Sequence, residues 1–265
     1  MVVAITGASA GIGRELARQL ASRGAKLVLG ARRLDKLEEL KRELGGDHVI
    51  VACDVSKTAD CERFVNAAIS AFGRLDTLVC NAGYGEFRRV AETTSEQFEA
   101  IFRTNLFGTM DCIRAALPQM AKQDPRDNYR GQIMIVSSAA ARRGLPFFGP
   151  YAATKAAQLS LAEALRVELG GKAIAVTSVH PIGTRTEFFE VAEQRGGRKM
   201  PNRVKFDLMQ DASVVARKMI RGIEHPRPEV WPFWPHRYLL ALGSIMPGMV
   251  DRVMGKARAT LDKAD

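Results

Sequence analysis

Near its start the chain reads Val2-Val3-Ala4-Ile5-Thr6-Gly7-Ala8-Ser9-Ala10-Gly11-Ile12-Gly13, and a charged helical pattern follows. The apolar run predicts a buried strand, and the three glycines permit a tight turn from strand to helix. Such a turn lets backbone approach a pyrophosphate, and the helix N-terminus offers it free N–H groups. We therefore predict a dinucleotide site that uses Gly7, Ser9, Gly11, Ile12 and Gly13. A plain structural turn is the alternative.

Working outward from this turn, short apolar runs alternate with amphipathic helical patterns. Strands are expected at 26–30, 49–53, 75–80, 132–137 and 173–180, and helices at 34–44, 59–72, 95–122, 151–169 and 211–224. Strands that are apolar on both faces belong in a parallel sheet covered by helices. The alternation predicts one doubly wound α/β domain of the Rossmann type over residues 1–265, with helices on both faces of a central parallel sheet.

Composition narrows the class of protein. Of 265 residues, 46% are hydrophobic and 26% are charged, which excludes a disordered chain and a collagen-like fibre. The net charge of +10 makes nucleic acid, an anionic membrane or an acidic ligand worth considering as partners. The basic residues are dispersed and form no known nucleic-acid module, so we expect no nucleic-acid partner.

The four cysteines, Cys53, Cys61, Cys80 and Cys112, show no spacing typical of zinc ligands. We expect no metal site, and we interpret the cysteines as reduced, buried side chains in a cytosol-like compartment. The first residues have no basic segment followed by a long apolar stretch, so no signal peptide is expected and the protein is predicted to be cytoplasmic.

The end of the second predicted strand indicates which nicotinamide dinucleotide is bound. An NAD site has an acidic residue near this point for the ribose 2′-hydroxyl, whereas this chain has Arg32 and Arg33. A guanidinium pairs well with a phosphate, so we predict NADP(H), with Arg32 as the main contact and Ser9 and Arg33 assisting. The alternative is that both arginines are only the solvated start of the next helix.

Two further strand ends carry candidate cofactor contacts. Asp54, followed by Val55, can accept a hydrogen bond from the adenine amino group, or it can simply cap the next helix. Asn81, Ala82 and Gly83 follow the fourth strand; the small residues let the chain pass close beneath a cofactor, and the asparagine side chain can tie loops together.

Taken together, these motifs resemble those of the short-chain dehydrogenases/reductases of about 250 residues. Residues 6–13 resemble the cofactor turn of that family, residues 81–83 its Asn-Ala-Gly motif, and Asn105 its helix asparagine. Tyr151-Ala152-Ala153-Thr154-Lys155 matches its YxxxK motif, with Ser138 at the usual interval before the tyrosine. The resemblance is dense over residues 1–190 and loose afterwards.

The resemblance implies hydride transfer between NADP(H) and a carbonyl compound or alcohol. Tyr151 and Lys155 are four residues apart on a predicted helix and so share a face. A nearby ammonium favours the phenolate, so Lys155 is expected to lower the pKa of Tyr151, the acid/base. Ser138 would hold the substrate oxygen. By resemblance, Lys155 also binds the nicotinamide ribose, and Asn105 holds a water that links Lys155 to solvent.

After the sixth strand the family usually has Pro-Gly, whose backbone holds the nicotinamide carboxamide. This chain has Pro181-Ile182-Gly183 instead. Ile182 and Thr186, with Pro181 and Thr184, are still expected to contact the cofactor. His180 is interpreted as a structural strand-end residue.

Substrate choice is expected in the loops above the strand ends, including a flap over residues 183–210. These loops carry an apolar wall of Tyr84, Phe87, Leu145, Phe147, Phe148, Phe188 and Phe189, which suits a hydrophobic ketone, aldehyde or alcohol. Arg88 or Arg143 could hold an acidic substrate tail, although an ordinary surface charge is favoured.

An apolar C-terminal extension spans residues 231–265. It is expected to cover the pocket or pack on a partner subunit; an interfacial helix on an anionic membrane, giving access to lipid-like carbonyls, is the less favoured alternative. Family resemblance implies a homodimer or homotetramer. A non-catalytic NADP(H)-sensing protein is a further alternative, but it would not need Tyr151, Lys155 and Ser138 together.

Overall fold

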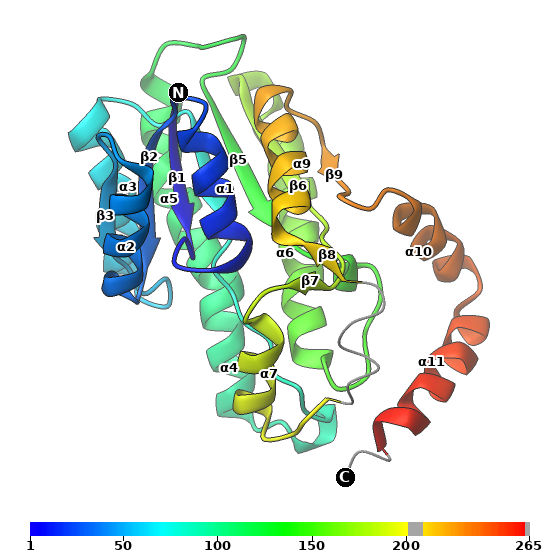
Figure 1. The fold of residues 1–265 in the computed structure, drawn as a ribbon. Coiled ribbons are helices and arrows are strands. Elements are labelled where there is room, and N and C mark those ends of the chain that lie inside the picture. The colour runs from blue at the N-terminus through cyan, green and yellow to red at the C-terminus, as the bar shows by residue number, and fades with distance from the viewer. Residues whose placement is uncertain (201–208, 263–265) are drawn as a thin grey trace.

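A parallel sheet forms the centre of the computed structural model, which describes residues 1–200 and 209–262 (Figure 1). Its strand order is β3-β2-β1-β4-β5-β6-β9. The strands are β1 (Val2–Thr6), β2 (Lys26–Ala31), β3 (Val49–Ala52), β4 (Thr77–Cys80), β5 (Gly131–Val136), β6 (Ile174–Val179) and β9 (Glu229–Val230). The order reverses between β1 and β4, so the chain leaves these two strands in opposite directions and opens a crevice at their carboxyl ends. The predicted doubly wound fold is confirmed.

Helices cover both faces of the sheet. One face carries α1 (Gly11–Ala21), α2 (Leu34–Leu44) and α9 (Ala212–Glu224), and the other carries α3 (Thr58–Phe72), α5 (Gly108–Lys122) and α6 (Gly149–Glu168). Short 3-10 turns lie at Val90–Glu92, Ala139–Ala141 and Gly170–Lys172. The inner strands β1, β4 and β5 are buried on both faces because the helices present apolar stripes to them, whereas the edge strand β3 is partly exposed.

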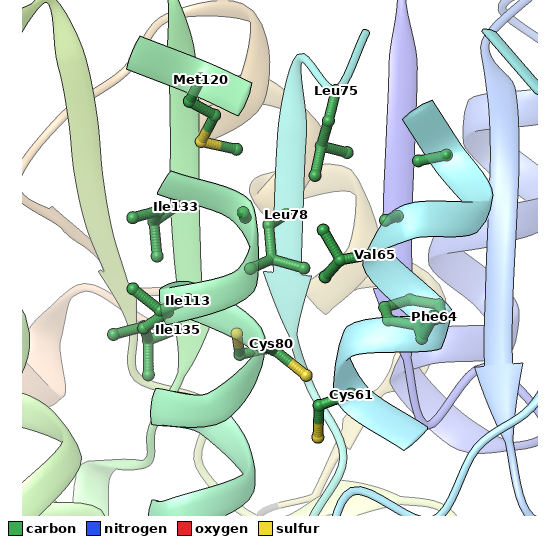
Figure 2. Close-up of a cluster of buried hydrophobic side chains, with 14 of the residues drawn as sticks. Cys61, Phe64, Val65, Leu75, Leu78, Cys80, Ile113, Met120, Ile133 and Ile135 are labelled. Atoms are coloured by element: carbon green, nitrogen blue, oxygen red, sulfur yellow. The ribbon is translucent and has the colours of Figure 1, made fainter. Parts of the chain in front are cut away.

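The core between the sheet and α3 and α5 holds the four cysteines. Figure 2 shows two of them, Cys61 and Cys80. Val65 of α3 lies beside Leu78 of β4, whereas the Phe64 ring packs against Gly30 of β2. Ile113 of α5 lies beside Ile135 of β5. All four cysteines are buried free thiols, as the sequence predicted.

The helix expected over 95–122 is not continuous. It consists of α4 (Ser95–Phe102), a π-helical segment (Arg103–Phe107) and α5. In this segment the backbone N–H of Gly108 bonds to the carbonyl of Arg103, five residues back. The Asn105 carbonyl accepts hydrogen bonds from the side chains of Thr109, at 2.8 Å, and Gln158, at 2.6 Å. The prediction of one regular helix was wrong because an apolar stripe alone does not reveal such an insertion.

The described part of the flap has regular structure. Two short strands, β7 (Thr184–Arg185) and β8 (Gln210–Asp211), pair in parallel, and α7 (Phe188–Gly196) lies between them in sequence. Residues 201–208 of the expected flap lie outside the described residues.

The C-terminal extension forms two helices, α10 (Pro235–Ile245) and α11 (Pro247–Asp262), which run beyond β9 and away from the sheet (Figure 1). No residue of α10 is buried, and the side chains of Trp234 and Ile245 are 67% and 77% exposed. Across residues 1–200 and 209–262, every helix is too short or too polar to traverse a bilayer.

Candidate active site

The turn between β1 and α1 has the close packing that its glycines predict. Gly7 and Gly11 have φ values of +66° and +55°, a region that L side chains rarely adopt. A Cβ on Gly13 would lie 2.5 Å from the carbonyl oxygen of Gly7. Only glycine therefore fits where α1 meets the strand.

The N-terminus of α1 fits an anionic group. Its N-cap residue, Ala10, is extended, and among the described residues no side chain caps the helix and its first turn has no acidic residue. The first N–H groups of a helix need acceptors, and they carry the positive end of its dipole. Gly7, Ser9, Ala10, Gly11 and Ile12 line the main cavity at this point, so the turn suits a pyrophosphate.

Asn81 fixes the same turn from the next strand of the sheet. Its side-chain amide donates to the carbonyl oxygens of Thr6 and Gly7, at 2.9 and 3.2 Å. The Thr6 hydroxyl in turn accepts from the backbone N–H groups of Asn81 and Ala82. The prediction that the asparagine ties two loops together is confirmed.

The two arginines after β2 have different surroundings. Arg33 donates to the hydroxyl of Ser9, at 3.1 Å, and forms a salt bridge with Glu187, at 2.5 Å. Arg32 is exposed and lines the cavity beside them. Ser9, Arg32 and Arg33 are thus brought together, and Glu187 adds a negative charge that the sequence analysis did not foresee.

Asp54 lines the cavity but also makes local contacts. Its carboxylate accepts from the backbone N–H and the hydroxyl of Ser56, at 3.1 and 2.8 Å. The carboxylate therefore shapes the turn before α3, while the neighbouring Val55 completes this part of the cavity wall.

Tyr151, Ser138 and Lys155 come together at the other end of the cavity. Tyr151 and Lys155 lie on the first turns of α6, and the Lys155 amine is 5.6 Å from the centre of the Tyr151 ring. Ser138 follows β5, and the influence of its side chain lowers the pKa of the Tyr151 phenol. All three residues line the cavity, as the YxxxK spacing and the preceding serine predicted.

Burial dominates the electrostatics of this cluster. It lowers the pKa of Lys155 to about 7, because removing water disfavours the ammonium. Burial also raises the pKa of Tyr151 to about 12, and the influence of the Ser138 side chain opposes this rise only in part. The expected lowering of the Tyr151 pKa is therefore not found in the protein alone, because desolvation of the phenol is the largest influence on that pKa.

The structure distinguishes Ser138 from its neighbour Ser137. The Ser137 hydroxyl is buried and donates to the Lys155 carbonyl, at 2.8 Å, so it holds α6 on β5. The carbonyl of Ser138 lies 3.2 Å from Nδ1 of His180, whose ring stacks on Trp231. Burial lowers the pKa of His180 to about 4, so the ring is neutral and structural, as expected.

Asn105 lies behind the cavity wall. Its side-chain oxygen accepts from the backbone N–H of Tyr84, and its amide donates to the Tyr84 carbonyl and the Thr154 hydroxyl. A Cβ on Gly83 would lie 3.1 Å from that oxygen and 3.6 Å from the Lys155 amine. The side chain of Asn105 is thus occupied in joining the π-helical segment to α6 and the loop after β4.

One cavity of about 900 Å³ connects these groups. Nearly all of the predicted cofactor contacts line it: Gly7, Ser9, Gly11, Ile12, Arg32, Arg33, Asp54, Val55, Asn81, Ala82, Gly83, Tyr151, Lys155, Pro181, Ile182, Thr184 and Thr186. Gly13 instead packs behind the turn. Thr186 lies so close to Gly11 that a Cβ there would be 2.9 Å from its methyl group, which places the Pro-Ile-Gly turn beside the first turn.

The predicted aromatic wall divides into two layers. Tyr84, Leu145, Phe148, Phe188 and Phe189 line the cavity. Phe87 and Phe147 are buried behind them with Ala192 and Met200, so their placement on the cavity surface was wrong. The cavity is also lined by residues of α10 and α11, so the C-terminal extension borders it: Leu239, Leu242, Met249 and Val253.

The two arginines considered for an acidic substrate differ in position. Arg143 lines the cavity and forms a salt bridge with Asp251 of α11. Arg88 donates to the backbone carbonyl of Arg195, at 2.8 Å, and serves to hold α7. Of the two, Arg143 is the one that lines the cavity.

Comparison with known proteins agrees with this arrangement. The family model for the short chain dehydrogenases matches residues 1–196. The chain belongs to the short-chain dehydrogenase/reductase family. It is 44% identical over 187 residues to "11-beta-hydroxysteroid dehydrogenase 1A" of Arabidopsis thaliana, an alignment that covers 68% of this chain and 51% of that protein. The chain thus spans about half the length of this curated relative.

Solved structures of this family share the fold. An alcohol dehydrogenase from the archaeon Thermococcus sibiricus, complexed with 5-hydroxy-NADP, is 30% identical and superimposes with a TM-score of 0.73 over 87% of this chain and 94% of that one. A short-chain dehydrogenase/reductase from Burkholderia phymatum, complexed with NAD, is 24% identical, with a TM-score of 0.82 over 94% of both chains. The second likeness shows the fold alone.

Two polar residues near the site were missed from the sequence. Gln158 bonds to Lys155 from one turn further along α6, and Glu187 pairs with Arg33. The spacing of three residues between Lys155 and Gln158 could have indicated the first contact, because such residues share a helix face. Nothing local in the sequence points to the second, since 154 residues separate the pair.

Proposed function

We propose that this short-chain dehydrogenase/reductase is an NADP(H)-dependent oxidoreductase that interconverts a hydrophobic ketone or aldehyde and the corresponding alcohol. The observation that carries the proposal is the shared cavity, in which Ser138, Tyr151 and Lys155 stand at one end and the glycine turn and Arg32 at the other. Hydride donation or acceptance is the chemistry that a bound nicotinamide supplies.

In this proposal Tyr151 is the acid/base. Its phenol protonates the carbonyl oxygen during reduction and takes the hydroxyl proton in the reverse direction. Ser138, which lines the cavity with Tyr151, holds the same oxygen. The pKa of about 12 for Tyr151 suits proton donation at neutral pH. Alcohol oxidation requires the phenolate, which the positive charges of Lys155 and an oxidised nicotinamide would favour.

Preference for NADP(H) is proposed from the charges beside the turn. Arg32, Arg33 and Ser9 can contact a 2′-phosphate, and a guanidinium binds phosphate through two parallel hydrogen bonds. Asp54 is proposed to contact the adenine, and Pro181, Ile182, Thr184 and Thr186 the nicotinamide end.

The cavity wall supports a hydrophobic substrate. Phe148 and Phe188 stand beside Tyr151, with ring centres 6.1 and 5.2 Å from its own. Leu239 and Leu242 of α10 face the cavity from the other side. Aromatic and aliphatic walls around a few polar groups are typical of sites for apolar small molecules.

A substrate screen tests this proposal. NADPH oxidation is followed by absorbance with aliphatic, aromatic, steroid and sugar carbonyls, each neutral ketone being paired with a carboxylated analogue. We expect turnover of hydrophobic ketones or aldehydes, with NADPH used in preference to NADH. Cofactor binding without turnover of any carbonyl or alcohol would favour the alternative of a non-catalytic NADP(H) sensor.

A membrane-associated reductase of lipid-like carbonyls is a second candidate, favoured by the exposed apolar residues of the C-terminal extension. Trp234, Tyr238 and Ile245 are each at least 65% exposed. Sedimentation with anionic vesicles tests this candidate. Membrane association is supported if the wild-type protein binds the vesicles, the double variant W234E/I245E does not, and the control V167E on α6 still does. A protein that stays in the supernatant, and whose mass in solution falls in the double variant, would support packing on a partner subunit.

We also propose a homodimer or homotetramer and a cytoplasmic location. The resemblance supports the first, and the buried free thiols suit a reducing compartment. Light scattering coupled to size-exclusion chromatography measures the mass of the assembly directly.

A further inference from the structure

Gln158 occupies a buried position between the Lys155 amine and the π-helical segment. Its side-chain oxygen accepts a hydrogen bond from Lys155 Nζ at 2.9 Å. Its amide nitrogen donates to the Asn105 carbonyl at 2.6 Å and to the Thr109 hydroxyl at 2.9 Å. The residue is 1% exposed, and Lys155, Asn105 and Thr109 are buried around it.

These contacts fix the orientation of the amide. A flipped amide would direct its NH₂ group at an amine that only donates when charged, and its oxygen at the Asn105 carbonyl, which only accepts. That carbonyl belongs to the π-helical segment, Arg103–Phe107, so the amide of Gln158 ties α6 to this segment. The Thr109 hydroxyl, which donates to the same carbonyl, completes the set.

The Lys155 amine is held from two sides. It donates to the Val136 carbonyl at the end of β5, at 2.8 Å, and to Gln158. An ammonium has three donors, so one remains on the side where Lys155 lines the cavity. Both acceptors stabilise the charged amine, whereas its burial opposes the charge.

We propose that Gln158 is a positioning residue for the reaction, because its amide connects the Lys155 amine to the π-helical carbonyl and thereby fixes both the direction and the charge of that amine. This inference rests on the proposed function in assigning a reaction to Lys155. The resemblance implied a water held by Asn105 at this link, but in this chain the Gln158 amide makes the link itself. A neutral amide does not release a proton at ordinary pH, so Lys155 exchanges its proton through the cavity side.

The charge of the Lys155 amine provides a test that does not depend on turnover. In protein labelled with ¹⁵N-lysine, the Lys155 signal is identified by its loss in Lys155→Met and is titrated without cofactor or substrate. We expect Gln158→Leu to lower the titration midpoint by about one pH unit, because an acceptor of the ammonium is lost. Gln158→Glu is expected to raise it, because a carboxylate favours the ammonium more strongly.

Gln132→Leu is the matched control. Gln132 is also a buried glutamine, bonded to Thr177 and Gly222 on the far side of the sheet, so its loss perturbs the core without touching Lys155. Equal midpoints in wild type, Gln158→Leu and Gln158→Glu would overturn the inference, as would an equal shift in Gln132→Leu. If Gln158→Leu fails to fold, the isosteric variant Gln158→Glu is the test. The inference is then overturned if the Lys155 midpoint in Gln158→Glu is not higher than in wild type.

Enzyme kinetics provide a second test of the role of Gln158. With a ketone found by the screen, Gln158→Leu is expected to lower kcat about tenfold at pH 7 and to move the basic limb of the pH profile to lower pH. KM for the ketone should change less, since Gln158 lies behind the lysine. A wild-type enzyme that reduces no carbonyl would refute the proposed function, while the titration would still decide whether Gln158 sets the charge of Lys155.

Discussion

The guanidinium of Arg33 contacts two residues that are far apart in the sequence, the hydroxyl of Ser9 at 3.1 Å and the carboxylate of Glu187 at 2.5 Å. These contacts join the first βα turn to the segment after β6 at the edge of the cavity. Arg33 and Glu187 are each more than 40% exposed, so their ion pair contributes little to stability. Its importance is local, because Glu187 competes for an arginine that a 2′-phosphate would use.

The cofactor preference can be tested by reversing charge at this edge. Arg32→Glu is expected to raise KM for NADPH by about 10- to 100-fold, because a charge-assisted contact to phosphate is lost and replaced by repulsion. KM for NADH should change much less. Glu187→Gln should lower KM for NADPH severalfold by releasing Arg33. Arg42→Glu, at an exposed arginine near the end of α2, is the control and should leave KM for NADPH unchanged. A wild-type enzyme that prefers NADH would contradict the proposed NADP(H) preference.

The glycine turn can be tested through stability. Gly13→Ala places a Cβ 2.5 Å from the Gly7 carbonyl and 2.6 Å from the Asn81 amide, so we expect a loss of about 1–3 kcal/mol in the free energy of unfolding and weaker NADPH binding. Gly248→Ala on α11, where the added Cβ meets open space, should change stability by less than about 0.5 kcal/mol. Chemical denaturation of both variants makes the comparison. Equal stabilities would show that the turn is not closely packed.

The buried Lys155 predicts a pH dependence of stability. Its pKa is about 7 in the folded protein, against 10.5 for the ordinary side chain, so between these values the unfolded chain binds the extra proton. Stability must then rise with pH. From pH 7.5 to 9 the deprotonation of Lys155 is expected to raise the free energy of unfolding by about 2 kcal/mol, since each pH unit corresponds to about 1.4 kcal/mol. Denaturation at each pH should show the rise in wild type but not in Lys155→Met. If the free energy of unfolding depends on pH in the same way in wild type and Lys155→Met, the pKa of Lys155 is not lowered by burial.

His180 makes a contribution in the acidic range. Burial holds its pKa at about 4 in the folded protein, below the ordinary 6.5, so the unfolded chain takes up a proton first as the pH falls. Stability is therefore lost between about pH 6.5 and pH 4. His180→Gln should flatten this part of the stability curve, while His225→Gln on the exposed end of α9 should leave it unchanged. A curve as steep in His180→Gln as in wild type would refute the assignment.

Much of the fold was predictable because its signals are local. Buried strands such as Val2–Thr6 are apolar on both faces, and Gly7, Gly11 and Gly13 mark a turn that other residues cannot adopt. The proximity of Tyr151 and Lys155 was also predictable, because two residues four positions apart on a helix share a face. In these cases the residue type and its immediate neighbours already determine the structure.

The features that could not be predicted from the sequence depend on contacts between segments that are far apart in the chain. The π-helical segment lies between α4 and α5, whereas the apolar residues of 95–122 predicted one regular helix. Phe87 and Phe148 are both aromatic loop residues, yet only Phe148 lines the cavity, because α7 covers the other. The pairing of Arg33 with Glu187 likewise exists only once β2 and the segment after β6 have been brought together.

The role of Tyr151 is the central claim, and one substitution tests it. Tyr151→Phe removes the phenolic hydroxyl and keeps the ring that packs against Phe148 and Phe188. With a ketone that wild type reduces, the account predicts a loss in kcat of about 100- to 10,000-fold, with NADPH binding retained. Tyr129→Phe, at an exposed loop tyrosine, should keep full activity. A purified Tyr151→Phe enzyme that reduces the ketone as fast as wild type would contradict the account.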